Sequence, residues 1–320
     1  MNRYRLVHVT EFTYDGPVSE SYNQVWLRPR QDDRQSCLSF RLTTDPHSRA
    51  SSYVDPSGNW VHRFNITAEH RRLRVEAESV VLVQQPVPMP AETIPLTALD
   101  DYAEELDEHY DLLAPTSYVP HSPGLAELVE LAGQESDGTA GGYARAASLL
   151  VHGRFRYEKG ATHVHSSIHD AMATGAGVCQ DFAHLLLALL RMRGLPGRYV
   201  SGYLAPTRSG AYSSGMEEVI GGMASHAWAE VFIPGAGWFG LDPTAGRDVD
   251  LRHVRVAYGR DYGDVAPVRG VYKGHAGQRR SVDVRVRPAL DDEGSEHIKE
   301  TSAEPVRVPS PEDLPQQQQQ

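Results

Sequence analysis

The sequence predicts an α+β protein in which an N-terminal antiparallel β-sandwich precedes a core of helices packed on an antiparallel sheet. Three observations support this fold class. Residues 1–85 contain short strand-type segments separated by turn residues, as in a β-sandwich. A proline-rich stretch follows at residues 86–95. Helical patterns come next and strand patterns come last, an order typical of α+β domains. We therefore expect domains at residues 1–90 and 91–288, with a tail at 289–320.

The strands of the first domain follow from alternation of side-chain type. In the first run, at residues 4–11, the set Tyr4, Leu6, His8 and Thr10 alternates with the set Arg5, Val7, Val9 and Glu11. Further strand-type runs occupy residues 21–27, 37–43, 60–66 and 73–83. Asp55-Pro56-Ser57-Gly58-Asn59 separates two strand-type runs and has the residues of a hairpin turn. No acid–base or metal-binding pattern occurs in this part of the chain.

The second domain begins after a linker, because four prolines in ten residues oppose both helix and central strand. Helices are expected at residues 98–113, 124–132 and 142–151. Strands are expected at residues 198–204, 226–233, 238–241, 254–257, 270–272 and 282–286. The tail is acidic and proline-rich and ends in five glutamines, which predicts disorder.

Composition excludes several classes of protein. The net charge of −11 resides in residues 91–113 and 289–320, which carry −8 and −6, so the remainder is nearly balanced. It has no basic stripe for nucleic acid and no polybasic membrane patch. No run of about 18 apolar residues and no secretory signal pattern is present. The two cysteines, Cys37 and Cys179, lack disulfide or metal-ligand spacing, so a reducing cytoplasm is expected.

Cys179 begins an amphipathic helix. The apolar residues behind it recur at i, i+3, i+4, i+7 and i+8, namely Phe182, Leu185, Leu186, Leu189 and Leu190. Gly177 just before it permits a close backbone approach, and Gly194 with Pro196 ends the helix. Unpaired N–H groups at a helix N-terminus stabilise a thiolate and can receive an oxyanion. The position suits a nucleophile, although a buried structural cysteine satisfies this pattern too.

A histidine and an acid follow in a predicted hairpin, SHAWAEVFIPGAGWFGLDPT at residues 225–244. His226 opens the first strand and Asp242 closes the second, so both lie at one end of the ladder. A four-residue turn pairs Ala229 with Asp242, three positions from His226, so a bulge or another turn register is expected. A cysteine on a helix start with a histidine and an acid on neighbouring strands is the papain-type arrangement.

The blocks GVCQDFAH, RYVSGYL, SHAWAEVF and GWFGLDPT together resemble the bacterial branch of the transglutaminase-like superfamily. YRLVHVTEFTYDGPV, NQVWLRPR and DPSGNWVHRF resemble the β-sandwich that precedes the core in these proteins, and VAYGRDYGDVAPVRGVYKG resembles the segment after the family's aspartate. The resemblance covers residues 3–288. It implies a papain-like or transglutaminase-like core with Cys179 as nucleophile, His226 as general base and then acid, and Asp242 orienting the imidazole. The Cys179 N–H is the candidate oxyanion donor.

These residues predict a thiol enzyme that attacks peptide or isopeptide-type amides and forms a thioester. Transfer of the acyl group to water is favoured, because no amine-recognition motif is present. Transfer to an amine, as in protein-glutamine cross-linking, is the first alternative, and it is weakened by the lack of an EF-hand loop. A non-catalytic peptide-binding scaffold is the second. A protein or peptide is the expected partner, no cofactor or metal is expected, and the oligomeric state is left open.

Other residues near the three motifs rank lower. Gln180, Tyr203 and Trp228 are the candidates for substrate contact, although aromatic residues on strands commonly belong to the core. Asp181 is expected to favour the helix dipole rather than to take part in the chemistry. The charged loop at residues 260–264 either borders the cleft or forms a structural ion pair. The cluster of His163, His165 and His169 lacks metal-ligand spacing and is expected at the surface.

Overall fold

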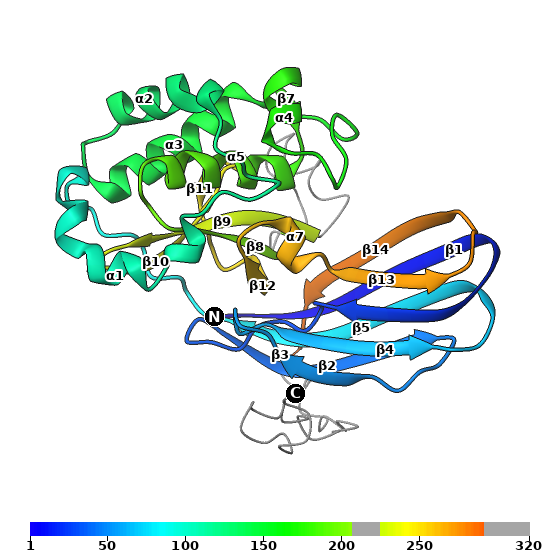
Figure 1. Cartoon of the computed structure of the whole chain (residues 1–320). Helices are drawn as coiled ribbons and strands as arrows, with labels where there is room; N and C mark the ends of the chain where they lie inside the picture. Colours follow the sequence, from blue (N-terminus) through cyan, green and yellow to red (C-terminus); the bar gives the residue numbers. More distant parts are fainter. Residues whose placement is uncertain (207–224, 291–320) are drawn as a thin grey trace, which may run out of the picture.

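The computed structural model describes residues 1–206 and 225–290, which form a curled N-terminal sheet and a second sheet covered by helices (Figure 1). The predicted α+β class is confirmed, with the antiparallel β-layer preceding the core of helices and sheet. Within the described residues, no helix is both long and apolar enough to cross a bilayer. The part of the predicted tail from residue 291 onward lies outside the described residues.

The N-terminal sheet has seven antiparallel strands arranged around one long strand, β1 (Asn2–Val25). The first half of β1 pairs with β5 and β14, and its second half pairs with β4 and β13. Side chains from both halves, including Phe12, Val25, Phe64 and Val75, form one hydrophobic cluster, so the sheet folds over itself as a sandwich does. The other early strands are β2 (Gln35–Asp45), β3 (Ser51–Val54), β4 (Trp60–Ile66) and β5 (His70–Val83).

Local turn chemistry explains the β3–β4 hairpin. Val54 pairs with Trp60, and the Asp55 N–H donates to the Asn59 carbonyl at 3.0 Å. Gly58 sits in the turn at φ +76°, a conformation that side chains with a Cβ rarely adopt. The turn predicted from the sequence is therefore the turn that forms.

The last two strands correct the predicted domain boundary. β13 (Val268–Lys273) and β14 (Gln278–Pro288) pair with β1, so they belong to the N-terminal sheet and not to the core. Figure 1 shows these two orange strands beside the dark-blue β1, although the colours mark opposite ends of the described chain. The sequence pattern identifies a strand by its alternation but not the partner to which it hydrogen-bonds, and this is why residues 268–288 were assigned to the core.

The core sheet has the strand order β11-β10-β9-β8-β12, and helices α2 to α5 lie on one side of it (Figure 1). Its strands are β8 (Gly197–Leu204), β9 (Ser225–Ile233), β10 (Gly237–Asp242), β11 (Arg247–Asp248) and β12 (His253–Gly259). A short parallel pair is made by β6 (Arg156–Tyr157) and β7 (Ala176–Gly177). The α-helices are α1 (Ala103–Asp107), α2 (Ala126–Glu135), α3 (Ala140–Arg154), α4 (Ile168–Thr174), α5 (Cys179–Met192) and α7 (Tyr262–Val265).

The predicted helix over 98–113 is broken into short pieces: η1 (Leu96–Tyr102), α1 and η2 (Tyr110–Leu112), with η3 (Pro123–Leu125) before α2. None of the pieces at 96–112 contains a buried residue, so nothing packs them into one continuous helix. The opposite holds for α5, which is central: all its residues from Gln180 to Arg191 are buried, between the sheet and the other helices.

The two sheets are joined by a continuous interior. The largest hydrophobic cluster includes Leu6 and Val81 of the N-terminal sheet together with Leu186 of α5. A buried ion network crosses the same interface, because Arg255 lies 3.4 Å from Glu230 and 3.3 Å from Asp32. The N-terminal sheet is therefore held against the core by apolar and charged contacts alike.

Candidate active site

Cys179 is the first residue of α5, as the sequence predicts. The backbone just before it is fixed by the β6–β7 pair, in which the Glu158 N–H donates to the Gly177 carbonyl at 2.9 Å. The N–H groups of the first helical turn have no partners within the helix, and they lie at the same end of α5 as the sulfur. The Cys179 side chain is half-buried and lines a cavity.

His226 and Asp242 form a buried pair beside this cysteine. The His226 Nε2–H donates to Asp242 Oδ2 at 2.8 Å, and both side chains are fully buried. An ionised carboxylate only accepts, so the proton is on Nε2 and His226 Nδ1 is left to face other groups. Nδ1 is buried without a hydrogen-bond partner of normal geometry among the described residues. His226 lines the same cavity as Cys179, so it is placed to exchange a proton with the thiol.

The hairpin brings the pair together without a bulge. Leu241 pairs with Ala229 and Gly237 pairs with Ile233, so the loop is one residue shorter than the turn assumed from the sequence. Asp242 lies one position beyond the last pair, diagonal to His226 and on its face of the sheet, because side chains alternate along a strand. Of the two expected solutions, a bulge or another turn register, the structure has the second. The pairing is shifted by one residue from the count for a four-residue turn, and that residue decides which face of the sheet the carboxylate occupies.

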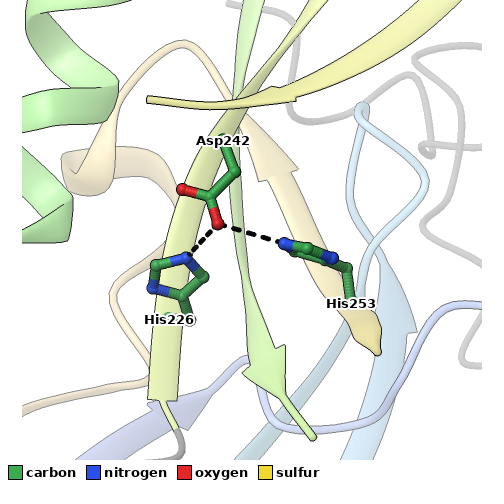
Figure 2. Close-up of side chains that lie close together, drawn as sticks. All are labelled: His226, Asp242 and His253. Atoms are coloured by element: carbon green, nitrogen blue, oxygen red, sulfur yellow. Dashed lines mark hydrogen bonds and ion pairs between the residues drawn. The ribbon is translucent and has the colours of Figure 1, made fainter. Parts of the chain in front are cut away.

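A second histidine, which the sequence interpretation missed, contacts the same carboxylate oxygen. His253 Nε2 lies 3.1 Å from Asp242 Oδ2, and Figure 2 shows both imidazoles directed at that oxygen. His253 Nδ1 is 3.0 Å from both the N–H and Oδ1 of Asp250. If the His253 ring is neutral, its Nδ1 accepts the Asp250 N–H; if the ring is protonated, its Nδ1–H donates to Asp250 Oδ1. In either state Nε2–H donates to Asp242.

Four donors therefore saturate the buried Asp242 carboxylate. Besides the two imidazoles on Oδ2, the backbone N–H groups of Thr244 and Ala245 donate to Oδ1 at 3.0 and 3.2 Å. Burial raises the pKa of Asp242, but the charge and hydrogen bonds of His226 and His253 outweigh it and hold this pKa well below its ordinary range. The carboxylate is thus a fixed negative charge behind the imidazole.

The pKa of His226 is raised to about 10. Burial lowers it, but the Asp242 charge and hydrogen bond, with a smaller contribution from the Cys179 thiol, raise it further than burial lowers it. Protonated His226 is therefore favoured beside the Asp242 carboxylate, and this is the protonation state of the imidazole that a thiolate–imidazolium pair requires.

Replacing His226 by glutamine is expected to remove a pH-dependent part of the stability. A histidine whose pKa is raised on folding stabilises the fold fully below its unfolded pKa of about 6.5, and this contribution is lost as pH rises through about 10. The free energy of unfolding should differ between wild type and His226→Gln by a few kcal/mol at pH 6 and by much less at pH 10. Urea denaturation at both pH values measures this. The exposed His165→Gln serves as control, and equal differences at the two pH values would contradict the assignment.

Of the three residues proposed for substrate contact, Gln180 and Tyr203 line the cavity. The Gln180 side-chain amide donates to the Val164 carbonyl at 3.3 Å, and the Tyr203 hydroxyl is 2.9 Å from His8 Nδ1. Trp228 corrects the expectation. It is fully buried outside the cavity lining and packs edge-on against His253 at 5.1 Å, so it supports the histidines from behind.

Asp181 has the structural role favoured from the sequence. Its carboxylate accepts the Val178 N–H at 2.8 Å and the Thr162 hydroxyl, which caps α5 and anchors the preceding loop. Burial raises the pKa of Asp181, and the Thr162 and Val178 hydrogen bonds oppose that shift. The charged loop combines both expected roles, because Arg260 pairs with Asp264 at the surface while Tyr262 lines the cavity.

Two groups of side chains contain atoms of the kind that bind metal ions. His163 and His165 are exposed, and His163 Nδ1 accepts the His165 N–H at 3.2 Å. The ligand-type atoms of His226, Asp242 and His253 lie within 4.8 Å of one another. Asp242 Oδ2 lies 2.8 Å from His226 Nε2 and 3.1 Å from His253 Nε2. Both are normal N–H···O distances, so hydrogen bonds account for this arrangement.

Sequence comparison defines the class of protein. Residues 4–82 match the family described as the bacterial transglutaminase-like N-terminal region, and residues 127–243 match the transglutaminase-like superfamily. The chain belongs to the bacterial branch of the transglutaminase-like superfamily. The second match spans Cys179, His226 and Asp242.

Individual relatives extend over most of the chain. It is 36% identical to "Uncharacterized protein ML0607" of Mycobacterium leprae over 89% of its own length and 99% of that protein. Identity to "Uncharacterized protein Rv2569c" of Mycobacterium tuberculosis is 34%, over 84% and 87% of the two chains. A further match, 34% identical, joins 22% of this chain to 10% of a Pseudomonas aeruginosa protein named "Protein-glutamine gamma-glutamyltransferase".

A solved structure shares the whole fold. The crystal structure of a Cytophaga hutchinsonii protein, named "Putative Cysteine Protease", superposes with a TM-score of 0.68 at 22% identity. The superposition covers 91% of this chain and 92% of that one. At this level of identity the likeness concerns the fold, namely the curled sheet followed by the core of helices and sheet.

Proposed function

We propose that this protein is a thiol enzyme that cleaves peptide or isopeptide-type amide bonds through an acyl-enzyme on Cys179 and transfers the acyl group to water. The observation that carries the proposal is the meeting of the α5 N-terminus and the His226–Asp242 pair at one cavity. A cysteine kept only for packing has no need of a buried imidazole whose pKa is raised by a carboxylate.

The reaction uses groups that this chain supplies. The sulfur of Cys179 bonds to the amide carbon, and the displaced electron pair rests on the carbonyl oxygen, near the N–H groups that open α5. His226 gives its Nδ1 proton to the leaving nitrogen as the C–N bond breaks, which leaves a thioester. Water then gives a proton to His226 and attacks the thioester, and the acid and free thiol are released. Asp242 keeps the imidazole oriented throughout.

Acyl transfer to an amine is the second candidate, because it shares every step up to the thioester. The short match to the Pseudomonas aeruginosa protein named for glutamyl transfer supports this second candidate. A non-catalytic peptide-binding scaffold is the third, and it gives no reason for the His226–Asp242 pair. A protein or peptide substrate remains the proposed partner, and a cytoplasmic location remains a prediction from the two unpaired cysteines.

Mass spectrometry of the intact protein is expected to detect the acyl-enzyme. Incubation with a proteome-derived peptide mixture and rapid acid quench should add peptide mass to the wild type, and the adduct should map to Cys179. Products formed with and without added methylamine distinguish hydrolysis from acyl transfer to an amine. Free carboxylates under both conditions indicate hydrolysis, and methylamides indicate acyl transfer. No adduct and no new products would reject both and leave the scaffold.

A further inference from the structure

The cavity at the active site is built by both sheets. Its volume is about 200 Å³, and it is lined by Cys179 and His226 together with core residues such as Tyr199 and Val256. The opposite wall comes from β1, the residues next to it in the chain and the two C-terminal strands, namely Thr10, Trp26, Leu27, Val268 and Val282. A group held at the sulfur therefore touches the N-terminal sheet as well as the core.

The wall formed by β1 is uncharged. His8 has both ring nitrogens occupied, by the Tyr203 hydroxyl at 2.9 Å and the Thr10 hydroxyl at 3.0 Å. Burial lowers the pKa of His8 to about 4, although Asp283 opposes this shift, so the ring is neutral at neutral pH. These polar groups satisfy one another, and they offer a substrate an apolar, aromatic surface without a counter-ion.

Among the described residues of the lining, the charged side chain besides His226 is Arg280 on β14, which is exposed. Arg280 would attract an acidic substrate, and that is the alternative to an apolar one. The rest of the lining is apolar, aromatic or uncharged, and it includes Val178, Ala227 and Pro267. Away from His226 and Arg280 the cavity favours an apolar group, because a charge placed there would lose water without gaining a partner.

We propose that this cavity is the subsite for one large apolar side chain, of the size of leucine or phenylalanine, on the residue that flanks the scissile amide. The inference rests on the proposed function, and it gives the N-terminal sheet a role in substrate selection. The volume agrees with this, since an engineered apolar cavity of about 150 Å³ in another protein binds benzene.

Val282 offers the sharpest test, because it lies on the edge strand β14 opposite Thr10 and is 39% exposed. Val282→Trp should narrow the cavity without disturbing a core. Val271→Trp is the matched control: Val271 is also an edge-strand valine, 69% exposed, and it lies outside the cavity lining. Circular dichroism and thermal unfolding establish that both variants fold.

Cleavage of a proteome-derived peptide library is expected to show leucine or phenylalanine enriched about tenfold or more over aspartate next to the cleaved bond. Val282→Trp should lower kcat/KM for a phenylalanine peptide about tenfold relative to its alanine analogue, through overpacking. Val271→Trp should leave this ratio unchanged. A wild-type preference for acidic residues, or a ratio that Val282→Trp does not change, would overturn the proposal.

A binding measurement separates this subsite from the chemistry. Calorimetry on Cys179→Ala should detect N-acetyl-phenylalaninamide but not N-acetyl-aspartamide, and Val282→Trp in that background should weaken the binding. Binding without turnover by the wild type would reject the proposed function and retain the subsite. Turnover without any side-chain preference would retain the proposed function and reject the subsite.

Discussion

Cys179→Ala is expected to lower turnover by about 10⁴-fold or more, because removal of a nucleophile from a triad leaves only the contribution of the remaining site. The fold should survive, since Cys179 is half-buried and alanine suits the first turn of a helix. Steady-state cleavage of a peptide identified in the library experiment measures the loss. Activity close to wild type in this variant would contradict covalent catalysis.

The second cysteine provides the control for this prediction. Cys37 lies on β2 and is not part of the cavity lining, and burial raises the pKa of its thiol to about 11, although the nearby Arg28 opposes that shift. Cys37→Ala should retain turnover. Iodoacetamide at pH 7 should modify Cys179 in the folded protein and leave Cys37 unmodified, because the thiolate is the reactive form. Equal labelling of both would argue for the scaffold.

Asp242→Asn is expected to lower kcat about 10³-fold or more, by changing the tautomer of His226. The backbone N–H groups of Thr244 and Ala245 hold one oxygen of residue 242. An asparagine that satisfies them must turn its NH₂ group toward both imidazoles. His226 Nε2 then accepts, its proton moves to Nδ1 on the Cys179 side, and the ring no longer takes a proton from the thiol.

Asp250→Asn is the matched control, since it removes a carboxylate from the far side of His253 and keeps Asp242 intact. Its effect on kcat should be about tenfold or less. The pH dependence of alkylation supplies a second readout: Asp242→Asn should shift the profile of Cys179 labelling to higher pH, and Asp250→Asn should shift it little. Comparable losses in the two variants would place the key interaction at His253 instead.

The sequence predicts those parts of the site that depend on local pattern. The stripe from Phe182 to Leu190 defines α5 and places Cys179 at its start, and the HAW and LDPT blocks place His226 and Asp242 at the ends of a hairpin. The turn length was not readable, because PGAG fits a four-residue turn as well as the shorter loop that forms. One residue of register separates a buried pair from two side chains on opposite faces.

His253 was missed for a different reason. It opens β12, whose seven residues are all buried, so the strand shows no alternation that would single out a functional side chain. Its contact with Asp242 depends on β12 lying next to β8, which no local pattern encodes. Trp228 was predicted to contact substrate because it is an aromatic residue two positions from His226. In the structure its ring instead fills the space beside Gly202. A Cβ on Gly202 would meet the Trp228 ring at 2.5 Å.

The pairing of Tyr4 with Pro288 ties almost the first residue of the chain to nearly the last described one. During synthesis, β1 can pair with β5 early, but the edge of β1 that β14 covers stays open until the core of helices and sheet has left the ribosome. Closing so long a loop is slow, and an unpaired edge invites association with other chains. Expression of residues 1–90 alone is therefore expected to yield an aggregation-prone fragment, and a circular permutant that begins at β13 offers a better route to an isolated N-terminal sheet.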